Sequence, residues 1–438
     1  MSELIGREEV RESLDRHLVG RLSGSTPTLL AITGMPGVGK SAVALDWGND
    51  RAHLFPDGQL YVDLRSLENN APMTPSAALH GFLAALGHPA SSLPKEIHEL
   101  SAMYRTALAG RRMLILLDNA HSADQVRPLL PNSPGSVTVV TSRSRLAGLT
   151  IRDGAVRIDL DCLSAAASVH LLAKLIGTNR VHAEPEAAAT LASLCGNLPL
   201  ALQITAERLA SHPVNPLSEW VDMMTRNADQ LEHLDIPGDP TTSVRAVFSW
   251  SYLALPAATS RLFRHLGLSD EPEFEAAQVI RAFDAQQPVE AHLAMLVDAS
   301  LLTSPVPGRY RLHKLVHLYA RERAEAEEGS EYMVDFARRL RRSRRVIAGT
   351  YGAPPLLSAQ RTGAGDRRPD GLGERGGIDG AAETAHVHGP TWRGLQGCCP
   401  VGLLDSECQG SELGAAGAGH APGGNRASPT VPGMLQSA

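Results

Sequence analysis

Residues 28–47 read TLLAITGMPGVGKSAVALDW, and this stretch indicates the fold of the N-terminal half of the chain. A short β-rich apolar run leads into a loop of the pattern GxxxxGK[ST], and a helical pattern follows it. Glycines in this loop allow backbone N–H groups to turn inward around phosphate, and the positive end of the following helix adds to the attraction. The stretch therefore predicts a strand, a phosphate-binding loop and a helix. The loop residues are Gly34, Met35, Pro36, Gly37, Val38, Gly39, Lys40 and Ser41.

Two of these loop residues have predicted roles of their own. Lys40 is expected to neutralise the β and γ oxygens of a bound nucleotide, and the Ser41 hydroxyl is expected to bind Mg²⁺. Asp118, at the end of the apolar run LILLD, is the second expected metal residue. Ligand sites of α/β proteins lie at the C-terminal edge of the sheet, so we expect Asp118 to hold Mg²⁺ through water.

From about residue 28 to 160, β-rich runs alternate with helical stretches. The runs after the first are GQLYVDL, MLILLD and VTVVT. Such alternation predicts a parallel sheet covered by helices on both faces, here the α/β three-layer domain of a P-loop NTPase.

Two residues bear on whether the nucleotide is hydrolysed. Many P-loop hydrolases have a second acid after the metal-binding Asp, but this chain has Asn119, which cannot accept a proton. At most slow hydrolysis is expected, and Asn119→Asp is expected to raise it. Arg143 follows the strand VTVVT and could reach the γ-phosphate as a sensor; an ordinary solvated arginine is the alternative.

Composition shifts divide the chain into five segments. After an N-terminal segment (1–24) and the nucleotide-binding domain (25–160), residues 161–238 carry apolar residues at helical spacing and predict a helical domain. Beyond the breaker IPGDP, three amphipathic segments lead into LLTSPVPGRYRLH, where a Pro-Gly turn separates two β-like runs. This order predicts a winged-helix domain over 239–340.

The segment 341–438 is expected to be a disordered, low-complexity tail. Residues after 345 hold half of the 40 glycines and three of the five cysteines, without a sustained period. A segment of this kind cannot bury enough apolar surface to order itself. It reads either as a flexible linker or as out-of-frame translation of GC-rich coding DNA. The run RRLRRSRR at 338–345 could hold phosphate, or it could be a solvated helix end.

Charge and hydropathy narrow the class of protein. The formal net charge is −6 and 43% of residues are apolar, with no uninterrupted apolar run near the roughly 20 residues of a membrane span. The N-terminal sequence MSELIGREEV does not resemble a secretory signal, so a cytoplasmic protein without a membrane partner is expected. Neither the charge nor the cysteine spacing indicates a general nucleic-acid surface, a metal cluster or a disulfide framework.

The order of these motifs resembles the NB-ARC group of signal-transducing P-loop ATPases. The sequence segments FPDGQLYVDLR and LILLDNA are similar to segments of bacterial regulators of the AfsR/SARP type. The resemblance covers about residues 3–340. The resemblance implies that an hhGRE element, here including Gly6 and Arg7, packs near the adenine. It assigns Pro199, in a GLPL-like motif at 196–200, to the base. It assigns His313, in an MHD-like motif, to the β-phosphate of ADP.

The same resemblance implies a nucleotide switch. ADP would hold a closed form, and exchange for ATP would release the winged helix and permit self-association, with Mg²⁺ as the metal and an unknown protein as a further partner. Two departures matter. Lys314 replaces the usual Asp of the MHD motif, and the DNA-binding and repeat regions of the larger regulators are not recognised here. We therefore expect a nucleotide switch without the repeat region that senses a signal and without the DNA-binding region that responds to it.

Two other functions stay open at this point. An active ATPase of AAA-like type would need a catalytic acid where Asn119 stands. A winged-helix DNA-binding regulator would need a basic recognition helix, but the segment EFEAAQVIRAFDAQQPVEAHL is acidic. DNA binding by this chain is therefore not expected.

Overall fold

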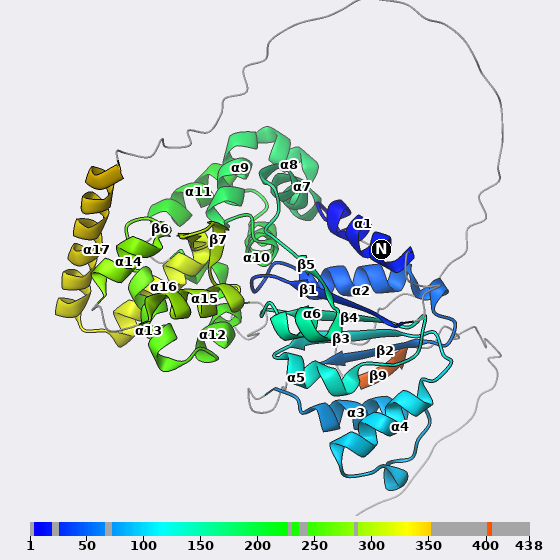
Figure 1. The fold of residues 1–438 in the computed structure, drawn as a ribbon. Coiled ribbons are helices and arrows are strands. Elements are labelled where there is room, and N and C mark those ends of the chain that lie inside the picture. Colours follow the sequence, from blue (N-terminus) through cyan, green and yellow to red (C-terminus); the bar gives the residue numbers. More distant parts are fainter. Residues whose placement is uncertain are drawn as a thin grey trace, which may run out of the picture. The chain divides into compact units, whose positions relative to one another are not determined.

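The computed structural model describes residues 4–19, 26–65, 72–226, 230–235, 243–283, 288–351 and 401–404 (Figure 1). These residues lie within one compact unit, Met1–Ser406. The cysteines at 398, 399 and 408 and most of the predicted tail lie outside the described residues. None of the described helices is long and apolar enough to cross a membrane.

A parallel sheet forms the centre of the N-terminal half. Its strands run in the order β5-β1-β4-β3-β2, and β9 (Val401–Leu404) pairs antiparallel with β2. The predicted strand runs are confirmed, and β5 is an additional strand that the alternation did not indicate. The five parallel strands are β1 (Thr28–Thr33), β2 (Gln59–Asp63), β3 (Leu114–Ala120), β4 (Val137–Ser142) and β5 (Val156–Asp159).

Helices cover both faces of this sheet, because alternate residues of each strand point to opposite sides. Leu30 and Ile32 belong to a core that includes residues of α1 and α2, whereas Leu29 and Ala31 pack with α3 and α4. The predicted three-layer α/β class is therefore confirmed. The helices are α1 (Glu8–Val19), α2 (Lys40–Asp50), α3 (Pro75–Ala85), α4 (Ile97–Ala107), α5 (Ala123–Val126) and α6 (Ala147–Asp153).

The next segment is helical, as its apolar spacing predicts. Three of its helices begin with a proline or with a serine cap; Ser164, for example, accepts a hydrogen bond from the backbone of Ala167. A proline at the first helical position loses no hydrogen bond, because that N–H has no partner within the helix. The helices are α7 (Ala165–Ile176), α8 (Thr178–Ala183), α9 (Pro185–Leu194), α10 (Pro199–Ala210) and α11 (Leu217–Arg226).

The third segment combines helices with a small antiparallel sheet. The predicted hairpin is present as β7 (Thr303–Val306) and β8 (Arg309–Arg311), and β6 (Glu273–Glu275) completes the order β6-β8-β7. Its assignment as a winged-helix domain stays a prediction. Its helices are α12 (Val244–Leu253), α13 (Ala257–Leu266), α14 (Ala276–Ala282), α15 (Val289–Asp298) and α16 (Lys314–Glu327).

A long helix, α17 (Ser330–Tyr351), runs across the boundary at 341 where the tail was expected to begin. Phe336 is 1% exposed, and the Ser343 hydroxyl donates to the carbonyl of Gln278 on α14. The helix therefore has a packed face over about two turns, from Phe336 to Ser343. The sequence does not indicate this face clearly, because arginines surround its few apolar residues.

Candidate nucleotide-binding site

The predicted phosphate loop connects β1 to α2, and its glycines adopt conformations that other residues rarely take. Gly37 and Gly39 have φ of 79° and 96°, in the left-handed region. A Cβ at Gly34 would lie 2.3 Å from the carbonyl oxygen of Leu160, so a side chain there would clash with the backbone. The loop thus requires glycine for both conformation and space.

Lys40 lies at the end of this loop, as the first residue of α2, and is 7% exposed. Its Nζ atom donates to the carbonyls of Gly34 and Met35, both at 2.9 Å. Among the described residues no carboxylate forms an ion pair with this ammonium group. Burial, assisted by the charge of Arg143, lowers the pKa of Lys40 to about 7. The charge of Asp118 opposes this shift without an ion pair to the ammonium group, so this position favours a further anion from outside the chain.

Asp118 and Ser41 meet next to the loop as the sequence predicts. The Ser41 hydroxyl donates to Asp118 Oδ1 at 2.7 Å, and the Thr141 hydroxyl donates to the same oxygen. Burial raises the pKa of Asp118, although these two hydrogen bonds oppose the shift. A hydroxyl beside a buried carboxylate fits the oxygen ligands that Mg²⁺ prefers. Ser41 and Asp118 would hold such an ion, and its positive charge would stabilise the charged form of Asp118.

Asp63 is a site residue that the sequence analysis missed. It ends β2 directly opposite Asp118 of β3. The Asn119 side-chain amide donates to Asp118 Oδ2 at 2.7 Å and to Asp63 Oδ1 at 3.0 Å, and so bridges the two carboxylates. Asn119 has a φ of 58°, which asparagine tolerates better than most residues. The strand GQLYVDL ends in a carboxylate like LILLD, and that shared signal could have identified Asp63.

Arg143 lies directly after β4, and its contacts are with the third segment. Its Nη1 atom donates to the carbonyl of Val247 at 2.9 Å, and its guanidinium lies over the Trp250 ring at 5.0 Å from the centroid. Burial and the nearby charge of Arg65 lower the pKa of Arg143 to about 10. Nothing in the local sequence around Arg143 indicated these partners, because α12 follows β4 only after the whole helical segment.

The N-terminal element attaches to the back of the phosphate loop. Arg7 is 7% exposed, and it donates through Nη2 to the carbonyl of Val38 at 2.7 Å and through Nη1 to the carbonyl of Asp161 at 2.8 Å. Gly6 has a φ of 68°, and a Cβ there would lie 2.6 Å from the Ala167 side chain. Gly6 and Arg7 therefore hold the loop against the start of the helical segment; their packing on adenine stays a prediction.

Pro199 is the first residue of α10, which also contacts the loop. The backbone N–H of the next residue, Leu200, donates to the carbonyl of Gly37 at 3.2 Å. A Cβ at Gly37 would lie 3.2 Å from the Leu200 side chain. The GLPL-like motif thus contacts the phosphate loop, while contact of Pro199 with a base stays a prediction.

His313 precedes α16, and both of its ring nitrogens form hydrogen bonds with the protein backbone. Nε2 lies 2.8 Å from the carbonyl of Gly196, and Nδ1 accepts a hydrogen bond from the backbone of Leu315 at 3.3 Å. Nε2 must carry the proton, because a carbonyl can only accept. Burial lowers the pKa of His313, which favours this neutral form. A bond to the β-phosphate, as predicted, would require His313 to leave Gly196.

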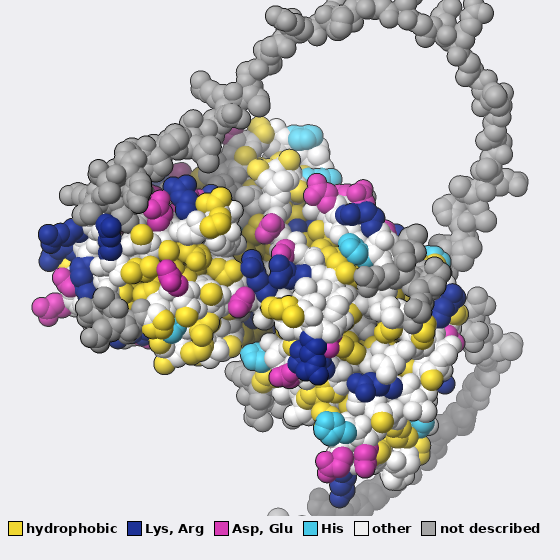
Figure 2. Space-filling model, viewed as in Figure 1, with side chains coloured by type: hydrophobic (Ala, Val, Ile, Leu, Met, Phe, Trp, Pro, Cys, Tyr) yellow, Lys and Arg dark blue, Asp and Glu magenta, His cyan; other side chains and the backbone are white. Residues whose placement is uncertain are grey.

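The arginine run at 338–345 lies within α17, where basic side chains gather at the left of Figure 2. Arg338, Arg341 and Arg342 are exposed, and Arg341 pairs with Asp270 at 2.7 Å. These described residues favour the solvated helix over a phosphate site.

Comparison with known proteins identifies the N-terminal half. A family model described as an AAA domain matches residues 22–134. The regulatory protein AfsR of Streptomyces griseus is 42% identical over 306 residues, covering 70% of this chain and 31% of that protein. AfsR of Streptomyces coelicolor is 41% identical over 307 residues, covering 70% and 30%. The chain therefore spans about a third of the length of these relatives.

More distant matches reach plant proteins and solved structures. The disease resistance protein RML1A of Arabidopsis thaliana is 24% identical over 228 residues, covering 50% of this chain and 22% of that protein. The crystal structure of a signal transduction ATPase with numerous domains from Pyrococcus horikoshii has 16% identity and a TM-score of 0.35, covering 81% of this chain and 46% of that one. The resemblance to NB-ARC signalling ATPases is confirmed, and the chain carries an AAA-type P-loop domain related to part of the AfsR regulatory proteins.

Proposed function

We propose that this chain is an ADP- and ATP-binding switch of a bacterial regulatory protein, in which Mg²⁺-nucleotide controls conformation and self-association. The observation that carries the proposal is the buried ammonium group of Lys40, which within the described part of the chain donates only to two backbone carbonyls of the glycine loop. A nucleotide phosphate would supply the missing negative charge, and the loop's N–H groups would add hydrogen bonds. We also place the protein in the cytoplasm, where both nucleotides are available.

Contacts between the three segments support a switch rather than a simple binding site. The phosphate loop accepts a bond from Leu200 of the helical segment, and the residue after β4, Arg143, bonds to Val247 of the third segment. His313 joins the third segment to the helical one through Gly196. A nucleotide that changes these contacts would change the segments' arrangement, provided that ADP and ATP differ in affinity for the two arrangements.

A second candidate, an active AAA-like ATPase, is favoured by the match of the AAA domain over residues 22–134. The amide of Asn119 opposes it, because this group donates to Asp118 and Asp63 and offers no base to an attacking water. The two functions differ in rate: a switch retains its nucleotide, whereas an ATPase releases product on each turnover.

The test is to purify the full chain, release its nucleotide with acid and identify it by chromatography, and then to measure turnover and sedimentation with Mg²⁺ and either ADP or a non-hydrolysable ATP analogue. The proposal expects retained ADP or ATP, slow turnover and a larger particle with the analogue. Rapid turnover with an unchanged particle size would support the ATPase instead. Absence of binding to both nucleotides would contradict both functions.

A further inference from the structure

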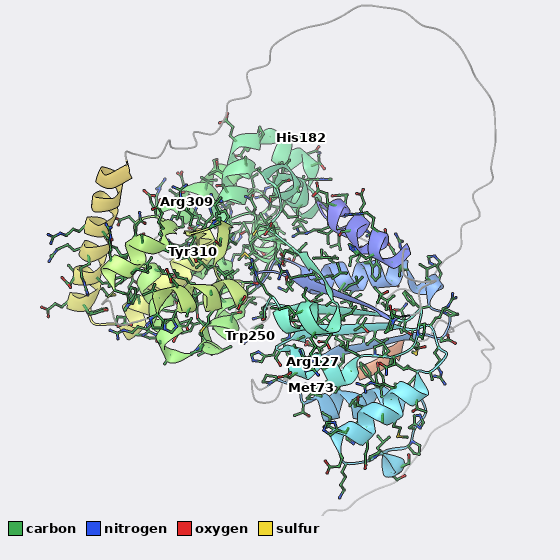
Figure 3. All side chains as sticks on the ribbon, in the orientation of Figure 1. Met73, Arg127, His182, Trp250, Arg309 and Tyr310 are labelled. Carbon is green, nitrogen blue, oxygen red and sulfur yellow. The ribbon has the colours of Figure 1, made fainter. Side chains whose placement is uncertain are left out.

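Two arginines from the sheet converge on one tryptophan of the third segment. Trp250, labelled in Figure 3, belongs to α12. The Arg143 guanidinium carbon lies 5.0 Å from the centroid of its ring, and that of Arg65 lies 5.6 Å from the same ring. Both distances are in the range of cation–π attraction. Two guanidinium groups, each from a residue that follows a strand, thus contact a single aromatic ring.

The two arginines differ in their other partners. Arg65 is held by Asp63, to which it donates from Nη2 at 2.7 Å and from Nε at 3.2 Å. Arg143 has no ion pair with a carboxylate among the described residues; it has the carbonyl of Val247 and the Trp250 ring. Arg65 is therefore anchored to its own strand, whereas α12 supplies the partners of Arg143.

The position of Arg143 places it at the phosphate end of the sheet. Ser142, the residue before it, is in register with Thr33, which directly precedes the phosphate loop. The charge of Arg143 also lowers the pKa of Lys40, so the two cations influence each other. A phosphate is a stronger partner for guanidinium than a neutral carbonyl and an indole face. A guanidinium turned toward phosphate would have to leave α12.

We propose that Trp250 and the Val247 carbonyl form a holding site for Arg143, which competes with the terminal phosphate of a bound nucleoside triphosphate. Trp250 is then a positioning residue: it sets the preference between ATP and ADP without contacting either nucleotide. Release of Arg143 from the holding site when ATP binds also removes one of the contacts between the sheet and α12. This inference rests on the proposed function, because it requires a nucleotide in the phosphate loop.

The experiment measures dissociation constants of the full chain for Mg²⁺-ADP and for a Mg²⁺-bound non-hydrolysable ATP analogue. In Trp250→Leu the analogue should bind more tightly relative to ADP by about three- to thirtyfold, since one cation–π contact no longer competes. Trp250→Phe keeps an aromatic face and should give a smaller change. Both variants should bind ADP itself as the parent chain does.

A double-variant cycle separates this effect from a general loosening of the fold. Arg143→Gln removes the guanidinium, and in that background Trp250→Leu should leave the ratio of the two dissociation constants unchanged. If Trp250→Leu changes this ratio equally in both backgrounds, Trp250 does not act through Arg143 and the inference is wrong. An unchanged ratio in the otherwise parental chain would also overturn it.

Tryptophan fluorescence gives a second measurement that does not require Trp250→Leu to fold. The difference between the spectra of the parent chain and Trp250→Phe isolates Trp250. The ATP analogue should shift this difference spectrum as Arg143 leaves the ring, whereas ADP should not. The absence of a shift with saturating analogue would contradict the proposal that ATP displaces Arg143 from this holding site. A parent chain that binds neither nucleotide contradicts the proposed function instead, so the two failures are distinguishable.

Discussion

The Nε2 atom of His313 lies 2.8 Å from the carbonyl oxygen of Gly196, and a Cβ added to Gly196 would lie 2.4 Å from the His313 ring. Gly196 also has a φ of 62°. Conformation and space therefore both require glycine at the place where the third segment meets the helical one.

Gly196→Ala should lower the stability of the folded chain more than His313→Ala does. The alanine methyl would displace the ring and strain the backbone, whereas His313→Ala removes the two hydrogen bonds of the ring, each worth about 1 kcal/mol. Thermal unfolding and amide hydrogen exchange of α16 would show the difference. Gly308→Ala is a suitable control, since Gly308 has a φ of 79° but no heavy atom within 4 Å of an added Cβ. A greater loss of protection in the control than in Gly196→Ala would contradict this role.

Acid should open the same contact. The pKa of His313 is lowered in the folded chain, so the unfolded state binds the proton more readily and stability falls as pH falls below the ordinary value of 6.5. Protonation also removes the acceptor that Nδ1 offers to Leu315. After correction for the intrinsic pH dependence of amide exchange, the protection of Leu315 should therefore fall as the pH drops below about 6.5, and His313→Gln should lose that pH dependence. The same fall in the variant would assign it to another group.

Asn119→Asp is expected to destabilise the chain, since it would place a third carboxylate beside Asp63 and Asp118 and remove the amide that bridges them. The loss should be about 1–3 kcal/mol and should grow as pH rises, because burial already raises the pKa of Asp118 and a further carboxylate beside it would raise that pKa more. Asn119→Gly removes the amide without adding charge and is the matched control. Denaturant titrations at pH 6 and 8 measure both variants. A higher hydrolysis rate with unchanged stability would restore the expectation drawn from the sequence alone.

Phe336 tests whether α17 is part of the folded unit. Its ring lies 4.5 Å from that of His265 and 4.9 Å from that of Phe283. Phe336→Ala should lower the free energy of unfolding by about 3–5 kcal/mol, the usual cost of such a truncation in a core. Val334→Ala on the same helix, where the side chain is 60% exposed, should have little effect. Equal effects of the two changes would show that α17 does not pack as described.

Some parts of the fold and of this site could be predicted from the sequence, and others could not. The phosphate loop, Asp118 and the strands around them were predictable, because a local pattern of glycines and apolar runs specifies each one. Asp63 carried the same signal as Asp118 and was missed only because it lacks a loop motif beside it. Trp250 had no local signal: its relation to Arg143 arises from tertiary packing across the helical segment. The long helix α17 was hidden by its arginines, since only Phe336, Leu340 and their neighbours form its packed stripe.

Nucleotide affinity should depend on pH in a direction set by Lys40. Its pKa is about 7 in the folded chain, and a bound phosphate would raise it. Binding then takes up a proton, so affinity should fall by up to about tenfold per unit as pH rises above 7. Calorimetry in buffers of different ionisation enthalpy would count the protons directly. Proton release, or no uptake at pH 8, would show that the ammonium group is already charged before binding.

We propose that the buried ammonium group of Lys40 holds the phosphates of an adenine nucleotide. Binding of Mg²⁺-ADP by the full chain and by Lys40→Ala tests this role, with Lys95→Ala as a control, because Lys95 is exposed on the surface. We expect tight binding by the parent chain and by Lys95→Ala, and at least about a hundredfold weaker binding by a folded Lys40→Ala, consistent with the roughly 3 kcal/mol of a strong charged hydrogen bond. Equal affinity of all three proteins for ADP would contradict it.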